Sequence, residues 1–429
     1  MAGGQYEAPL KRCGARIRIS ETNARRKKRM KRTLFSIVMV VLVLSTVLGS
    51  LPVLAEDAVV AGDDVRPAEA RAAAEYFAQS YVSAFPAWKE AAVGTPTDYY
   101  WPDGGISAFE FPIEDKTGVV GFLFISATKD YGPLFEASGG KAPSAYLDSA
   151  RILAAANGFI GQDFSGETRF LYYGALTYSV QFGEAMIAKG VAIHLPTGAV
   201  EQVSTEATVL QMDRQAADAS WAAVSALAPK GGYSVRSITW IYGVPAWYQD
   251  SYSGGHGDSG DDSNASWPSC AGTANDPWDY WDGCSPIAGA MVLGYWDTHG
   301  YPMGSSAYDD LLIDHAHYFM GTTDGGVTEP WNIDYGLWAT AYIYGYDFDA
   351  YNDNWVSWGD ITGEVSAGYP SVLSMLGQTY YGNHSVTVVG YEYHSPYQDV
   401  WVNNTWDTSQ HLIAFGSWSW ATLTRVHPN

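Results

Sequence analysis

The fold of the C-terminal half is decided by residues 283–296, which read GCSPIAGAMVLGYW. Pro286 suits the first turn of a helix, where its missing N–H is not needed, and the residues after it are apolar on every side, as in a buried helix. Strand-like runs rich in β-branched and aromatic residues follow at 371–377, 384–393, 399–403 and 412–415. A helix followed by a block of strands predicts an α+β fold.

Cys284 stands at the start of this helix. The unpaired amides of a helix N-terminus carry partial positive charge, which would lower the pKa of a thiol and could also hold an oxyanion. Gly283, directly before it, would let a substrate backbone approach closely. The same position also suits a packed cysteine or one half of a disulfide, so the motif alone leaves three interpretations open.

His384 opens an alternating strand, HSVTVVGY, and could serve as the base that a cysteine nucleophile requires. Such a base needs a third group to fix its tautomer, and the next strand, VWVNNTWD, offers one. Asn404 at the end of that strand is the first choice, with Asn403 and Asp407 as alternatives. A single histidine on a strand can equally be a polar residue with an ordinary hydrogen-bond partner.

Taken together with Val244-Pro245, Gln249 and His299-Gly300-Tyr301-Pro302, these motifs resemble the family thirty-nine-like cysteine peptidases. Those proteins are papain-fold relatives of the bacteriocin-leader-processing peptidases. Their usual signature is V-P-x-x-x-Q, then C-G-P-T-A, H-x-V-V-V-x-G-Y and V-N-D-x-W. The resemblance covers about residues 238–429 and implies a papain-like domain in which a helix carrying the cysteine packs on an antiparallel sheet.

The resemblance implies a role for four positions: Cys284 as nucleophile, His384 as base, Asn404 at the orienting position and Gln249 as a donor to the oxyanion. The family usually has Asp where this chain has Asn404. Ser285 replaces the usual Gly after the nucleophile, which would restrict the approach of a substrate. Gln249 lies 35 residues before Cys284, where the family has only a handful, so the insertion between them must loop out.

The N-terminus predicts export. Residues 25–32 are almost all basic, residues 34–51 are apolar, and Val53-Leu54-Ala55 provides small residues for cleavage after Ala55. Residues 1–55 are therefore expected to be an N-terminal extension and signal peptide, with an uncleaved membrane anchor as the alternative. Met30 competes with Met1 as the start codon. Both interpretations predict a secreted or cell-surface protein with no other membrane segment.

The charge excludes nucleic acid as a natural partner. Without residues 1–55, the chain has 13 Lys and Arg against 44 Asp and Glu, and from Trp240 onward Arg425 is the only basic residue against 22 acidic ones. An acidic surface of this kind favours basic peptides, bound cations or a saline medium, and it also has the simpler interpretation of solubility.

Before the peptidase-like region, residues 64–210 predict a small α+β domain. Helices are expected at 67–81 and 144–156, and strands at 118–127, 168–180 and 186–194. Residues 211–236 are expected to be a linker and 237–429 the peptidase domain, each domain having its own core. The first domain would be a propeptide, an inhibitory module or a substrate-recruiting module.

The insertion before Cys284 adds two further expectations. Asp258, Asp261, Asp262 and Asn264 place oxygen ligands in residues 258–264, which suits Ca²⁺ or, alternatively, a solvated acidic loop. Cys270 could form a disulfide with Cys284 in an oxidising exterior. No cofactor is required, and zinc is not expected, because His256, His315 and His317 lack the usual ligand spacing.

The sequence therefore predicts an exported cysteine peptidase that hydrolyses peptide bonds in peptides or proteins through a Cys-His-Asn/Asp triad and an acyl-enzyme. One alternative is an inactive papain-fold protein that binds a surface and holds a Cys270 to Cys284 disulfide. Another is amidase-like or transglutaminase-like acyl transfer, because the triad does not determine the acceptor.

Overall fold

The computed structural model describes residues 64–162, 164–203, 213–227, 238–249, 282–304, 309–323, 325–376, 383–394 and 397–429. Helices and strands are mixed throughout these residues, which confirms the α+β prediction. Residues 1–55, for which a signal peptide is expected, Cys270 and the expected calcium ligands in residues 258–264 lie outside the described residues. No helix among the described residues is long and apolar enough to cross a membrane. Nor do these residues contain a group of three His, Cys, Asp or Glu side chains arranged to hold a metal ion.

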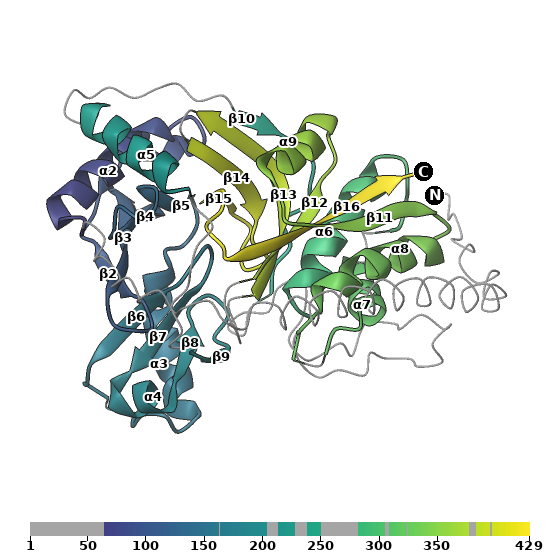
Figure 1. Cartoon of the computed structure of the whole chain (residues 1–429). Helices are drawn as coiled ribbons and strands as arrows, with labels where there is room; N and C mark the ends of the chain where they lie inside the picture. Colours follow the sequence, from purple (N-terminus) through teal and green to yellow (C-terminus); the bar gives the residue numbers. More distant parts are fainter. Residues whose placement is uncertain are drawn as a thin grey trace, which may run out of the picture. The chain divides into compact units, whose positions relative to one another are not determined.

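The C-terminal half is a sheet with helices on both faces (Figure 1). Its strands, in spatial order, are β11 (Phe348–Asn354), β16 (Trp420–Pro428), β12 (Ser371–Leu376), β13 (Asn383–His394), β14 (Tyr397–Asn403) and β15 (Gln410–Ala414). One face is covered by α6 (Cys284–Thr298) and α8 (Ile333–Ile343), against which α7 (Asp309–Met320) packs, and the other face is covered by α9 (Trp358–Ala367). The short strand β10 (Ile238–Trp240) pairs with β13.

Helix α6 is the central helix of this half, and its residues from Ser285 to Trp296 are all buried. This burial explains why the motif is apolar on every side, since α6 contacts both the sheet and the helices α7 and α8. On the opposite face, α9 begins with a capping box between Ser357 and Asp360 and ends at Gly368 in the left-handed conformation.

The N-terminal half continues the same sheet. Its strands are β1 (Ala92–Val93), β2 (Thr97–Tyr100), β3 (Ile106–Asp115), β4 (Gly118–Ser126), β5 (Leu134–Ser138), β6 (Thr168–Tyr172), β7 (Tyr178–Phe182), β8 (Val191–His194) and β9 (Val200–Gln202). Its helices are α2 (Pro67–Ser80), α3 (Leu147–Ala156), α4 (Gly183–Lys189) and α5 (Arg214–Leu227), with short 3₁₀ turns at Pro86–Glu90 and Pro143–Tyr146. Strand β5 pairs antiparallel with β15, so the two halves share one sheet (Figure 1).

The hydrophobic cores also cross between the halves. On β4, Phe122 and Phe124 face one core while Leu123 and Ile125 face the other, because successive side chains of a strand point to opposite faces. The second core brings α2 and α5 together with β14 and β15 through Phe77, Trp221, Tyr397, Trp401 and Leu412. The expected division into one core per domain is therefore not observed.

Three expected elements differ from the structure. Residues 168–180 form two strands, β6 and β7, joined by a turn in which Gly174 and Leu176 have positive φ. Residues 186–194 form the end of α4 and then β8, separated by Gly190 in the left-handed conformation. The supposed linker contains α5, whose Trp221 is buried and donates its indole N–H to the carbonyl of Tyr131.

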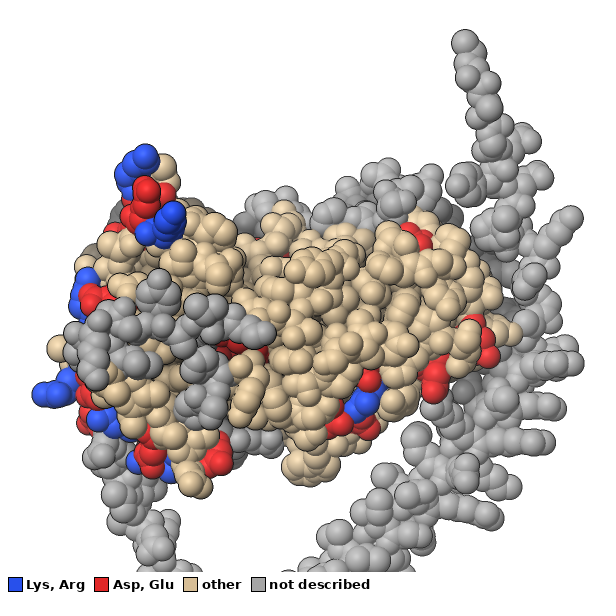
Figure 2. All heavy atoms as spheres, turned by 90° about the horizontal axis from the view of Figure 1, so that it is seen from above, with Lys and Arg blue, Asp and Glu red and all other residues tan. Residues whose placement is uncertain are grey.

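Charged residues are unevenly distributed over the face shown in Figure 2, where Lys, Arg, Asp and Glu gather mainly at the end formed by the N-terminal half. The only basic residue of the C-terminal half, Arg425, contacts three carboxylates, at 2.5 Å to Asp353, 2.7 Å to Asp360 and 3.1 Å to Glu364. This cluster ties β11 and β16 to α9.

Candidate active site

The conformation of the chain directly before Cys284 depends on a glycine. Gly283 has φ +93°, and a Cβ at this position would lie 2.4 Å from the carbonyl oxygen of Gly326. The glycine therefore allows the loop at Gly326 to pack closely against the chain, and it also lines the cavity described below, so close approach of a substrate here stays a prediction. Just before it, His317 Nδ1 lies 2.8 Å from the carbonyl oxygen of Asp282, which links α7 to the start of α6.

Cys284 forms no disulfide with any residue that the structure describes, and it is half-buried at the first residue of α6. The backbone N–H of Ser385 donates to its Sγ at 3.4 Å, so the thiol lies beside the residue that follows His384. Burial raises the pKa of the Cys284 thiol above its ordinary value, although hydrogen bonds from Ser385 and Ser285 oppose the rise. Burial therefore opposes the lowering of the thiol pKa that is expected from the helix N-terminus.

Three hydroxyl groups connect α6 to the sheet beneath the thiol. Ser285 Oγ lies 2.8 Å from Ser385 Oγ, which lies 2.9 Å from Ser374 Oγ. All three serines are buried. The hydroxyl group of Ser285, which replaces the Gly expected from the family resemblance, therefore forms its hydrogen bond within the protein.

The ring of His384 is fixed on two sides. Its Nε2 lies 2.6 Å from the carbonyl oxygen of Asn404, which can only accept, so Nε2 carries the proton and Nδ1 the lone pair. The ring also stacks on Trp406 at 3.9 Å between centroids. Burial lowers the pKa of His384 to about 3 against the opposing effect of the Asn404 carbonyl. No hydrogen bond among the described residues joins the ring to Cys284.

The side chain of Asn404 does not orient His384, in contrast to the expectation. Its Oδ1 accepts the backbone N–H groups of Trp406 at 3.0 Å and Asp407 at 3.2 Å, and its Nδ2 lies 2.8 Å from His411 Nε2. The orienting group is instead the backbone carbonyl of the same residue.

The two alternatives to Asn404 contact other residues. Asn403 donates through Nδ2 to the carbonyl of Pro245, and Asp407 lies against His411. Neither side chain has a hydrogen bond to His384.

Gln249 reaches the site despite its distance in sequence. Its buried side chain accepts the Gly283 N–H through Oε1 at 3.1 Å, and its backbone N–H donates to the carbonyl of Thr405 at 3.0 Å. Gln249 is therefore held between the residue before Cys284 and the residue after Asn404.

These residues line a cavity of about 530 Å³. Cys284, His384, Gln249 and Trp406 form part of its wall, and the N-terminal half forms another part through Leu176, Thr177, His194, Thr197, Ala199, Val200 and Glu201. Among the described residues that line the cavity, Glu201 is the only one with a carboxylate. Burial raises the pKa of Glu201 to about 7, opposed by hydrogen bonds from Ser179 and Tyr173.

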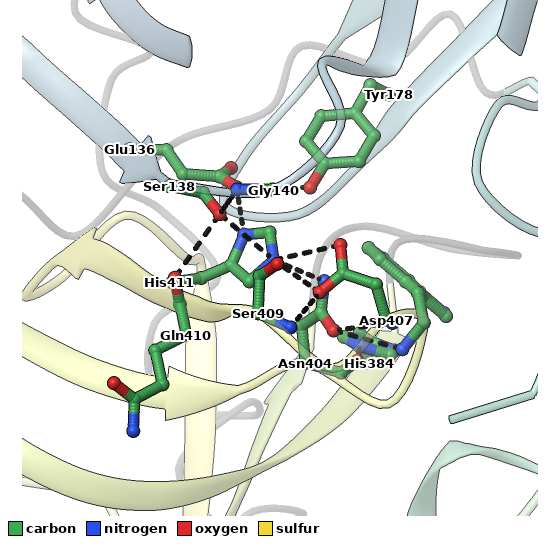
Figure 3. A network of polar contacts seen from close by, with 11 residues as sticks. Glu136, Ser138, Gly140, Tyr178, His384, Asn404, Asp407, Ser409, Gln410 and His411 are labelled. Carbon is green, nitrogen blue, oxygen red and sulfur yellow. Dashed lines mark hydrogen bonds and ion pairs between the residues drawn. The ribbon is translucent and has the colours of Figure 1, made fainter. Parts of the chain in front are cut away.

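A second histidine lies behind Asn404, at the start of β15 (Figure 3). His411 is buried, with Nδ1 2.9 Å from Glu136 Oε1 on β5 and Nε2 3.3 Å from Asp407 Oδ1. Burial opposes its charged form, but Asp407 and Glu136 raise the pKa of His411 to about 9. Its Nε2 accepts from Asn404 when the ring is neutral and donates to Asp407 when it is charged.

A protein-family model matches the part of the chain that contains Cys284 and His384. Residues 266–426 match the model described as the Peptidase_C39 like family. Residues 266–426, which include most of the C-terminal half, are therefore similar to this family. No curated protein matched the chain. The match includes Cys284, His384 and Asn404, whereas Gln249, Glu136 and Glu201 lie before it. The last two were not singled out in the sequence, because their contribution depends on the pairing of β5 with β15 and on the cavity wall.

Proposed function

We propose that this protein is an exported cysteine peptidase with a papain-like fold, in which Cys284 is the nucleophile and His384 the general base. The observation that carries the proposal is the shared cavity. Cys284, His384 and Gln249 come from three separate segments and line the same 530 Å³ space. The family match supports peptides or proteins as the substrate class.

In the proposed reaction Cys284 Sγ attacks the peptide carbonyl and its proton passes to Nδ1 of His384. The proton on Nε2 stays directed at the Asn404 carbonyl, which keeps the ring in the required tautomer. The imidazolium then protonates the leaving amine. Water, deprotonated by the same ring, hydrolyses the thioester and regenerates the thiol.

Oxyanion stabilisation is assigned to the Cys284 backbone N–H and to Gln249. The Gly283 N–H donates to Gln249 Oε1, which identifies Oε1 and Nε2 of the side-chain amide. The group that would donate to the oxyanion is therefore Nε2.

Wild type and Cys284→Ala, incubated with a denatured protein substrate, test this proposal. Cleavage by wild type and by a Cys270→Ser control, with none by Cys284→Ala, is the expected result. Equal cleavage by wild type and Cys284→Ala would refute it. Added hydroxylamine distinguishes acyl transfer, since a transferase would form the hydroxamate in preference to the acid.

A further inference from the structure

The position of His384 depends on a short loop, residues 404–409, between β14 and β15. Both contacts that fix the ring come from this loop: the carbonyl of Asn404 at 2.6 Å and the indole of Trp406. Between them Thr405 has φ +68°, although it is β-branched and buried. A β-branched residue rarely adopts this conformation, which costs about 1–3 kcal/mol and persists only where the surroundings enforce it.

Residues of the N-terminal half lie beside the loop at 404–409 and help to hold it in this conformation (Figure 3). The Asn404 amide is locked by two backbone N–H groups and contacts His411 at 2.8 Å. His411 is in turn bonded to Glu136 at 2.9 Å, and Glu136 also accepts the hydroxyl of Tyr178 at 3.1 Å. The side chains of Glu136 and His411 are 0% and 2% exposed.

The strand pairing strengthens this link. His411 lies opposite Ser138 in the β15 and β5 pair, and Ser138 Oγ donates to the carbonyl of Gln410 at 3.2 Å. Gly140, bonded to Ser138 Oγ, allows close approach of the loop, since a Cβ there would lie 2.9 Å from Ser409 Oγ and 3.0 Å from Asp407 Oδ2. Removal of β5 would take Glu136 away from His411 and leave the partly exposed Asp407 as its remaining carboxylate partner, and breaking a buried ion pair is strongly unfavourable.

We infer that Glu136 and His411 form a positioning pair for His384, so that the N-terminal half is a lasting component of the active site and not a removable propeptide. This inference rests on the proposed function in assigning a catalytic role to His384. Neither Glu136 nor His411 contacts the reacting atoms. They act through Asp407 and Asn404. Charged His411 donates to Asp407 Oδ1 at 3.3 Å, the Asp407 backbone N–H donates to Asn404 Oδ1 at 3.2 Å, and Asn404 carries the carbonyl that holds the histidine ring.

Glu136→Gln tests the inference, because it keeps the side chain's shape and removes its charge. The matched control is Tyr81→Phe, which removes another buried hydrogen bond between the halves, from Tyr81 to Asp399 at 3.1 Å. At a temperature where both variants are folded, kcat of Glu136→Gln is expected to fall about 10- to 100-fold with little change in KM. Tyr81→Phe is expected to retain wild-type kcat. Equal kcat in Glu136→Gln and wild type would overturn the inference, as would an equal fall in the control.

A measurement without substrate separates this inference from the proposed function. The ¹⁵N signals of His384 report its tautomer and its hydrogen bond to Asn404, and they are expected to shift in Glu136→Gln but not in Tyr81→Phe. If no substrate is cleaved, the peptidase proposal fails while the shift still supports the positioning pair. Unchanged His384 signals would refute it. If Glu136→Gln does not fold, Tyr178→Phe, which removes only the hydroxyl bonded to Glu136, replaces it with a smaller expected shift.

Discussion

The protonation state of Cys284 can be measured through the pH dependence of its alkylation by iodoacetamide. The pKa of the thiol is raised by burial and that of His384 is lowered to about 3, so both groups are neutral at pH 7 in the free protein. The perturbation is therefore pH itself, in a Cys270→Ser background in which Cys284 is the only cysteine of the chain after residue 55.

The slope of the alkylation rate against pH distinguishes a neutral thiol from a preformed thiolate better than the rate at any single pH. With a thiol pKa above the ordinary value, the thiolate fraction rises about tenfold per pH unit, so alkylation accelerates about 100-fold from pH 6 to pH 8. A preformed thiolate and imidazolium pair would instead give a plateau over this range. The absolute rate at pH 7 is a poor guide, because a more basic thiolate is also the stronger nucleophile and offsets its scarcity.

The assay is the second-order rate of iodoacetamide labelling, followed by intact mass between pH 5 and pH 9. His384→Ala is the matched control, and we expect it to keep the same slope, since no hydrogen bond joins its ring to the thiol. A plateau in wild type that disappears in His384→Ala would refute the assignment of two neutral groups.

Three further predictions concern single positions. Gly283→Ala is expected to destabilise the protein by about 1–3 kcal/mol from its positive φ alone, and more from the contact with Gly326, as measured by urea unfolding. Above pH 7, where Glu201 is mostly ionised, Glu201→Gln is expected to reduce kcat/KM for peptides with a basic residue near the cleaved bond by about tenfold, equivalent to about 1.4 kcal/mol, and to leave neutral peptides unchanged. Equal loss for both peptide classes would contradict this specificity role. Arg425→Met leaves three carboxylates without their cation and is expected to lower the free energy of unfolding by about 1–2 kcal/mol, with a smaller loss at high salt.

Local patterns predicted the elements of the C-terminal half well. The apolar run after Cys284 became α6, and the alternating run from His384 became β13, because burial on all sides and burial on one face leave clear marks in sequence. The prediction of one continuous strand at 168–180 and of another at 186–194 was wrong for a local reason. Gly174, Leu176 and Gly190 turn the chain at positions where the surrounding residues still favour a strand.

The site could be predicted only in part. Cys284 and His384 were proposed from the motifs and the family resemblance. That the backbone carbonyl of Asn404, and not its side chain, contacts His384 depends on the local conformation of residues 404–407, which the sequence did not reveal. Glu136 did leave a signal, because a lone carboxylate inside the apolar strand LFEAS must find a buried partner. That its partner is His411, 275 positions away, follows only from the pairing of β5 with β15.

The electrostatics of this network explain why Asn occupies position 404. His411 already faces two carboxylates, Glu136 and Asp407, and its positive charge balances only one of them. Aspartate at 404 would add a third negative charge to a buried cluster in which His411 supplies one positive charge, at a cost in desolvation and in repulsion between the carboxylates. Asparagine retains the acceptor that the N–H groups of Trp406 and Asp407 require and adds no charge. In the proposed mechanism the Asn404 carbonyl holds His384, and the pair of Glu136 and His411 lies on the far side of Asn404.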